Sequence, residues 1–175
     1  LYAIDNASQK LGTVDQATGV FTAGPVLTGA PVGHVITGLA IDPSSRTAYM
    51  SSTDTVASVL STIDLVNGAV TVVGEIGFEQ IVDIAVNCRG QIYGHDIVLD
   101  VIVRIDPSSG AGAPVGPTGF DANYAQGMDF DNTDGTLYAW LYQGNGVGEL
   151  ATIDLSTGAA TSVSTPPAGE YEGAI

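Results

Sequence analysis

Three carboxylates, Asp83, Asp129 and Glu172, are the residues of this sequence best suited to bind a hard cation. Carboxylate oxygens, together with backbone carbonyls, are the ligands that Ca²⁺ prefers in proteins. Like charges gathered at one place also need a cation, or raised pKa values, to be tolerated. The three residues lie far apart in the chain, so a shared site depends on the elements that carry them.

Two further acids, Asp131 and Asp134, lie in a segment that superficially resembles a calcium loop. A loop of the EF-hand kind has acids at alternate positions ahead of a glycine. Asp129 and Asp131 alternate in this way, but Thr133 breaks the pattern and Asp134 directly precedes Gly135. Both acids are therefore weaker metal candidates, and a simple turn is the competing interpretation.

Catalytic motifs are not evident in the sequence. His34 and His95 would each need a neighbouring nucleophile and an orienting acid, and no Gly-x-Ser-x-Gly motif is present. The glycines fall in expected hairpin turns rather than before a helix, so no phosphate-binding loop is predicted. We expect both histidines at the surface or in turns, and we assign no catalytic residue.

One segment combines aromatic and amide side chains with several glycines, and it contains Trp140, Tyr142 and Asn145. Sugar sites and assembly contacts both use such residues, while core packing is the alternative for Trp140. Asn6 begins an Asn-Ala-Ser glycosylation sequon, and residues 161–167 are rich in Ser, Thr and Pro. Both features favour an extracellular chain.

The elements that carry these residues are predicted to be short strands in a repeat. The clearest copy spans residues 38–74, with strands expected at 38–42, 47–50, 59–64 and 69–74, because β-branched and apolar runs there end at Asp, Pro, Asn or Gly. Tyrosines recur at separations of 47, 44 and 45 residues, and an Asp-x-x-[Thr/Ser/Asn]-Gly turn recurs in step with them. These markers are Tyr2, Tyr49, Tyr93 and Tyr138, and the turns that begin at Asp15, Asp64, Asp106 and Asp154. The period is typical of a propeller blade.

The repeat places the candidate carboxylates on equivalent strands. First strands of the blades line the central channel of a propeller, so equivalent positions form rings around its axis. The ring at position 38 reads Glu172, Gly38, Asp83 and Gly127, and the ring at position 40 reads Ala174, Ala40, Ala85 and Asp129. Three carboxylates are thus expected to converge on the channel as a cation site, with solvated acids at the channel mouth as the alternative.

The chain resembles the broad group of secreted bacterial and archaeal β-propellers, whose blades read Gly-Leu-Ala-x-Asp, Leu-Tyr-Ala and Ile-Asp-x-x-Thr-Gly. The resemblance covers the whole chain and implies an all-β, four-bladed propeller of antiparallel four-stranded blades. We expect one domain, 1–175, with blades at about 172–175 plus 1–33, 34–80, 81–124 and 125–171. The N- and C-terminal strands would complete one blade, and four blades of a larger ring are the alternative.

The composition of the chain excludes or disfavours several classes of partner and ligand. The formal net charge is −15, from 19 acids against four Lys and Arg, which disfavours nucleic acid and phosphate ligands. The sequence has no apolar run of 18 residues, so no membrane span is predicted. Cys88 is the single cysteine, which excludes an intrachain disulfide.

These observations favour a non-catalytic extracellular scaffold that assembles with copies of itself as a surface layer or filament, with Ca²⁺ as a stabilising ion. A carbohydrate- or protein-binding propeller is the first alternative. It would be expected to repeat its aromatic residues, but Trp140 aligns with Ser51 and His95 in other blades. A calcium-dependent hydrolase or lactonase that uses the channel carboxylates is the second.

Overall fold

Every element of the protein is a β-strand in the computed structural model, which describes residues 1–123, 126–165 and 167. The strands form four antiparallel sheets, which we call blades one to four in chain order. Blade one contains β1 (Tyr2–Asp5), β2 (Lys10–Val14) and β3 (Phe21–Val26); blade two β4 (Val35–Ile41), β5 (Ala48–Thr53), β6 (Ser58–Ile63) and β7 (Val70–Glu75); blade three β8 (Ile81–Val86), β9 (Ile92–Asp96), β10 (Val101–Ile105) and β11 (Gly112–Pro117); and blade four β12 (Gln126–Asp131), β13 (Thr136–Gly144), β14 (Val147–Ile153) and β15 (Ala160–Ser164).

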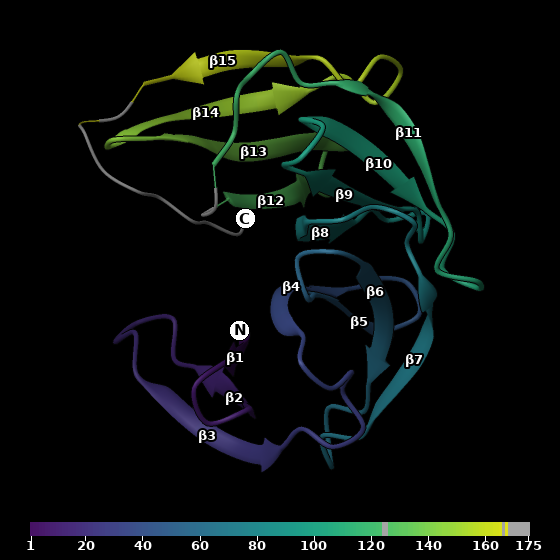
Figure 1. Cartoon of the computed structure of the whole chain (residues 1–175). Helices are drawn as coiled ribbons and strands as arrows, with labels where there is room; N and C mark the ends of the chain where they lie inside the picture. The colour runs from purple at the N-terminus through teal and green to yellow at the C-terminus, as the bar shows by residue number, and fades with distance from the viewer. Residues whose placement is uncertain (124–125, 166, 168–175) are drawn as a thin grey trace.

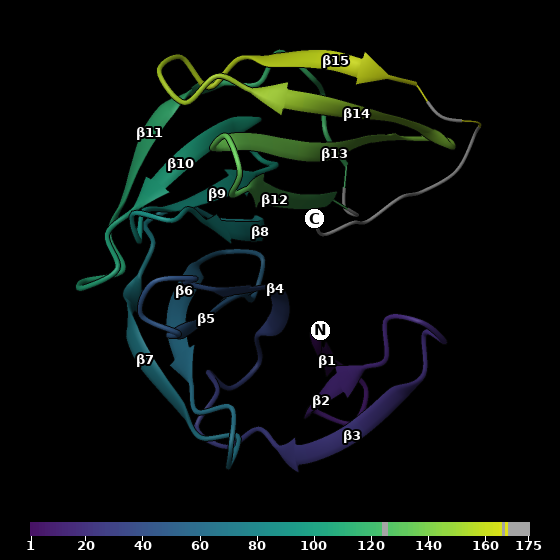
Figure 2. The same cartoon turned by 180° about the vertical axis from the view of Figure 1, so that it is seen from behind.

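The blades are arranged around a common centre, as Figure 1 shows. The innermost strands β1, β4, β8 and β12 lie nearest that centre, and β3, β7, β11 and β15 form the outer rim, in this view and in the view from behind (Figure 2). Blades one and four flank an open side that holds no described strand. This arrangement confirms the predicted all-β, four-bladed propeller.

The turns within the blades form as the repeated motif predicts. In the turn between β6 and β7, the amide of Gly68 donates to the carbonyl of Asp64 over 2.8 Å, and the Asp64 carboxylate accepts the amide of Val66. Gly68 has a positive φ of 76°, a conformation that favours glycine. The turns that begin at Asp15, Asp106 and Asp154 repeat these bonds.

Each blade has a leading face, directed at the next blade in the chain, and a trailing face, directed at the previous one. Three apolar clusters fill the junctions between consecutive blades. Leu11, Leu60 and Ile102 stand at one equivalent position on three leading faces, and each is buried against the following blade. The hydrophobic core is therefore divided into layers between blades.

The first blade has three described strands, because β1 aligns with the second strand of the other blades. The completing strand expected at 172–175 lies outside the described residues. Within the described part of the chain, there is no helix of the length and apolarity needed to cross a membrane.

Candidate functional site

The innermost strands enclose an axial cavity of about 360 Å³. All four blades contribute to it, because its wall comes from β1, β4, β8, β12 and residues beside them. The lining residues are Leu1, Tyr2, Leu39, Ala40, Ile41, Asp83, Ile84, Met128, Asp129 and Asn132. Two of the three predicted channel carboxylates, Asp83 and Asp129, therefore share one cavity.

Asp83 connects two blades through its carboxylate. The amide of Met128, in blade four, donates to Asp83 Oδ2 over 2.6 Å, and the amide of Ile84 donates to Oδ1 over 2.8 Å. Both amides belong to buried residues. The side chain thus supplies an acceptor to a backbone group 45 residues away, which sequence reasoning did not foresee.

Gly38 makes room for this carboxylate at the equivalent position of blade two. A Cβ atom added there would lie 2.8 Å from Asp83 Oδ1 and 2.8 Å from the Ile84 nitrogen. Both distances are too short for a carbon atom. Gly38 and Asp83 occupy equivalent positions in neighbouring blades, and the absence of a side chain at Gly38 leaves space for the carboxylate of Asp83.

Asp129 lines the same cavity from β12, and its Oδ1 accepts the amide of Phe130 over 2.8 Å. Glu172, the third predicted channel acid, lies outside the described residues. No group of three His, Cys, Asp or Glu side chains suited to a metal gathers in the described ranges. Two carboxylates and the amide side chain of Asn132 are thus the cation-binding groups that the described cavity offers.

Asp131 and Asp134 serve the turn between β12 and β13. Asp131 Oδ1 accepts the amide of Thr133 over 2.8 Å, and Asp134 Oδ1 accepts the amide of Thr136 over 2.9 Å. The amide of Thr136 lowers the pKa of Asp134. The turn interpretation accounts for the backbone bonds of both acids.

His95 is buried in β9, so the expectation of a surface or turn position is wrong for this residue. Only 2% of its surface is exposed, and no described residue accepts or donates a hydrogen bond at Nε2. Burial lowers the pKa of His95 to about 4, because a charged imidazole would lose its hydration. His95 is therefore neutral at pH 7.

His34 lies between a serine and an acid, a constellation that sequence reasoning missed. Its Nδ1 is 3.4 Å from Ser52 Oγ, and its Nε2 is 3.9 Å from Asp54 Oδ2. The second separation exceeds a hydrogen bond, and Ser52 is only 1% exposed. A nucleophile needs access to its substrate, so this geometry does not make Ser52 a hydrolytic serine.

The aromatic segment lies in β13 and the turn that follows it. Trp140 and Tyr142 are half-buried, and Asn145 is exposed at the turn with a positive φ of 54°. The Tyr142 hydroxyl accepts the amide of Gly146 over 3.1 Å. At the opposite end of the chain, Asn6 Nδ2, the atom that glycosylation would modify, donates to the carbonyl of Ile36 over 2.9 Å.

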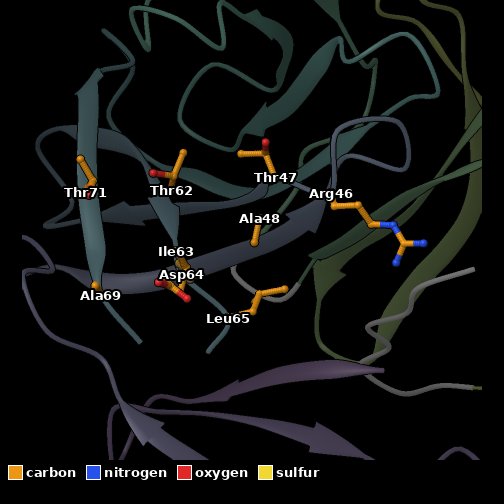
Figure 3. Close-up of a pocket in the computed structure, with 9 residues that line it drawn as sticks. All are labelled: Arg46, Thr47, Ala48, Thr62, Ile63, Asp64, Leu65, Ala69 and Thr71. Carbon is orange, nitrogen blue, oxygen red and sulfur yellow. The ribbon is translucent and has the colours of Figure 1, made fainter. Parts of the chain in front are cut away.

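Two hollows of about 520 and 570 Å³ lie at equivalent edges of blades two and three. Figure 3 shows the first, where Arg46 points away from Ala69 and Thr71. The second is lined by Arg89 and Arg104 at corresponding strand ends. Because equivalent edges of two blades have such a hollow, we attribute both hollows to the repeated blade structure and not to a specific site.

The fold and the axial cavity define the chain as a β-propeller, and comparisons with known proteins agree with this class. Residues 87–172 match a family model described as a domain of unknown function, DUF4394. A search of curated proteins found no match.

Solved structures with the same fold include a nidogen/laminin complex, with a TM-score of 0.68, 18% identity, and coverage of 94% of this chain and 60% of that chain. Virginiamycin B lyase from Staphylococcus aureus, in its H270A form with quinupristin, has a TM-score of 0.60 at 16% identity, with 94% and 52% covered. The calcium-binding protein regucalcin from Agrobacterium tumefaciens has a TM-score of 0.59 at 18% identity, with 94% and 58% covered. The chain spans about half to three fifths of the length of these structures, and the likeness concerns the fold alone.

Proposed function

We propose that the protein is a non-catalytic extracellular scaffold that assembles with copies of itself. The observation that carries this proposal is the use of Asp83, a residue suited to chemistry, as a connector between two blades. The repeated turn aspartates are likewise engaged with backbone amides, for example Asp106 with Ser108 over 2.7 Å. These carboxylates stabilise the repeat.

The comparison with the nidogen/laminin complex supports a role in protein contacts, because that propeller fold was solved in a complex of two proteins. A net charge of −15 and the glycosylation sequon at Asn6 agree with an extracellular setting. A glycan or another protein is the alternative partner.

The test is the size and shape of the native particle. Light scattering coupled to size-exclusion chromatography, followed by negative-stain microscopy, is expected to show oligomers or filaments of the 175-residue chain. A chain that stays monomeric across a wide range of concentration would refute the scaffold proposal. A monomer that also binds a glycan array would favour the alternative of a carbohydrate-binding propeller.

Calcium stabilisation is a second proposal, favoured by the axial cavity that holds Asp83, Asp129 and Asn132. The regucalcin comparison, with a protein described as calcium-binding, points the same way. Oxygen ligands from two carboxylates and one amide suit Ca²⁺, with water or backbone carbonyls completing the shell.

Thermal unfolding with CaCl₂ or with EDTA tests this second proposal. Calcium is expected to raise the melting temperature of the wild-type chain and to raise it less in the Asp129→Asn variant. Asp134→Asn is the matched control, since it neutralises an exposed turn acid outside the cavity. Equal responses of all three proteins would show that the cavity does not bind the ion.

A further inference from the structure

The sequence contains two Asn-Gly dipeptides, Asn67-Gly68 and Asn145-Gly146, and both lie in turns between consecutive strands. Asn-Gly is the preferred pair for the tightest hairpin turns, in which both central residues take a positive φ. It is also the pair at which the backbone most readily attacks an asparagine side chain, because glycine has no side chain to shield its nitrogen. The same dipeptide therefore favours a turn and makes it chemically reactive.

Asn145 occupies a two-residue turn between β13 and β14. Gly144 pairs with Val147 across the hairpin, and Asn145 and Gly146 have φ values of 54° and 77°. The second conformation favours glycine, so the presence of glycine at position 146 follows from the geometry of the turn. The turn thus places an unshielded backbone nitrogen directly after the Asn145 side chain.

The side chain of Asn145 is exposed, and it forms no hydrogen bond with any other residue that the structure describes. The amide of Gly146 donates over 3.1 Å to the hydroxyl of Tyr142, an acceptor that belongs to a side chain and not to the backbone. The carboxamide of Asn145 is therefore able to rotate toward the Gly146 nitrogen without losing a hydrogen bond of its own.

Asn67 also precedes a glycine, but its side chain is held at both ends. Its Nδ2 donates to Asp64 Oδ2 over 2.8 Å, and its Oδ1 accepts the amide of Ala69 over 2.8 Å. The amide of Gly68 donates to the backbone carbonyl of Asp64 over 2.8 Å. Attack on Asn67 requires its two side-chain bonds to open, whereas attack on Asn145 requires no such step. Because Asn67 is also exposed, solvent access does not explain the difference.

We propose that Asn145 is a site of spontaneous deamidation and that Asn67 is protected by its turn. In this reaction the Gly146 nitrogen forms a bond to the side-chain carbonyl carbon of Asn145 and gives up its proton. The bond from that carbon to Nδ2 breaks, and ammonia leaves with the proton. Water then opens the five-membered imide at either of its carbonyl carbons, which gives aspartate or isoaspartate. The reaction needs no oxidant, reductant or enzyme.

Deamidation changes the tip of the β13–β14 hairpin in charge and in length. Both products replace a neutral amide with a carboxylate, and isoaspartate also lengthens the backbone of the turn by one atom. Trp140 and Tyr142, the aromatic residues suited to sugar or assembly contacts, lie on the same hairpin. The inference goes beyond the proposed scaffold and does not rest on self-assembly, because it concerns one turn of a single copy.

The test follows both asparagines in the purified 175-residue chain during incubation at mildly alkaline pH. Peptide mass spectrometry of samples taken over time measures the replacement of amide by carboxylate at each position. The reaction at Asn145 is expected to be at least about tenfold faster than that at Asn67, because two hydrogen bonds must first open at Asn67. Equal rates in the folded chain, or a faster reaction at Asn67, would overturn the proposal.

The same measurement in urea separates the effect of structure from that of sequence. With the turn bonds absent, the two rates should approach each other, and a difference that persisted would show that the turn does not protect Asn67. A folded chain in which Asn145 keeps its amide, while the unfolded chain loses it, would likewise overturn the proposal.

Asp64→Ala removes the acceptor of Asn67 Nδ2 and tests the protection directly. This variant should react faster at Asn67 and at an unchanged rate at Asn145, and circular dichroism establishes that it is folded. An unchanged rate at Asn67 in the folded variant would show that the bond to Asp64 does not protect it.

Discussion

Replacement of Asp83 by alanine is expected to destabilise the propeller at the junction of blades three and four. The carboxylate accepts the amide of Met128 over 2.6 Å and that of Ile84 over 2.8 Å. Met128 is 5% exposed and Ile84 is 1% exposed, so both amides belong to largely buried residues. Asp83→Ala removes both acceptors at once.

The size of the effect follows from these two bonds. A buried donor that loses its acceptor costs about 1–3 kcal/mol, and water in the axial cavity can satisfy part of the loss, so the free energy of unfolding should fall by about 2–4 kcal/mol. Asp83→Asn keeps one carbonyl oxygen and should lose about half as much. Urea unfolding at 25 °C, followed by fluorescence and circular dichroism, measures these differences.

Asp134→Ala provides the comparison, because Asp134 also accepts a backbone amide but lies exposed in a turn. The amide of Thr136 can form a hydrogen bond to water instead, so Asp134→Ala should lower the free energy of unfolding by less than about 1 kcal/mol. If Asp83→Ala loses no more stability than Asp134→Ala, the account of Asp83 as a connector between blades is wrong.

Two further changes test the packing of single residues. The pKa of His95 is lowered to about 4 from 6.5, so the unfolded chain binds a proton before the folded chain does as the pH falls. The stability that the neutral imidazole contributes is present in full above pH 6.5. The free energy of unfolding should therefore decrease by about 3 kcal/mol between pH 6.5 and 4. Urea unfolding at pH 7 and pH 5 should show about 2 kcal/mol of this loss in the wild type and a smaller loss in His95→Gln, and equal losses would contradict the prediction. Gly74→Ala should destabilise blades two and three, because a Cβ there would collide with the backbone carbonyl of Ser109; a melting temperature equal to that of the wild type would contradict this contact.

The strands and turns could be predicted from the sequence because their causes are local. The strands of blade two were expected at 38–42, 47–50, 59–64 and 69–74, and they are found at Val35–Ile41, Ala48–Thr53, Ser58–Ile63 and Val70–Glu75. An aspartate that accepts the next amides and a glycine with positive φ define each turn within five residues. Such information is present in any short window of the chain.

The roles of Asp83 and His95 could not be predicted in the same way, because they depend on a neighbouring blade. The acceptor role of Asp83 requires the amide of Met128, which comes close only when blade four packs on blade three. His95 aligns with Ser51, which is itself fully buried, but the burial of this repeat position is visible only in the structure. Pairing of residues between blades is fixed by packing and not by local pattern.

Departures from the repeat are therefore the most informative positions of this chain, and they differ in what they mean. Asp83 in place of glycine is a structural departure, because it comes with the space left by Gly38 and with two buried amide bonds. Asp129 in place of alanine lines the same cavity as Asp83, but its Oδ1 accepts the amide of the next residue, Phe130, and not an amide of another blade, so it is the better candidate for a ligand. Phe21 keeps the apolar character of its repeat position, but it is 36% exposed and belongs to none of the apolar clusters formed by the described residues.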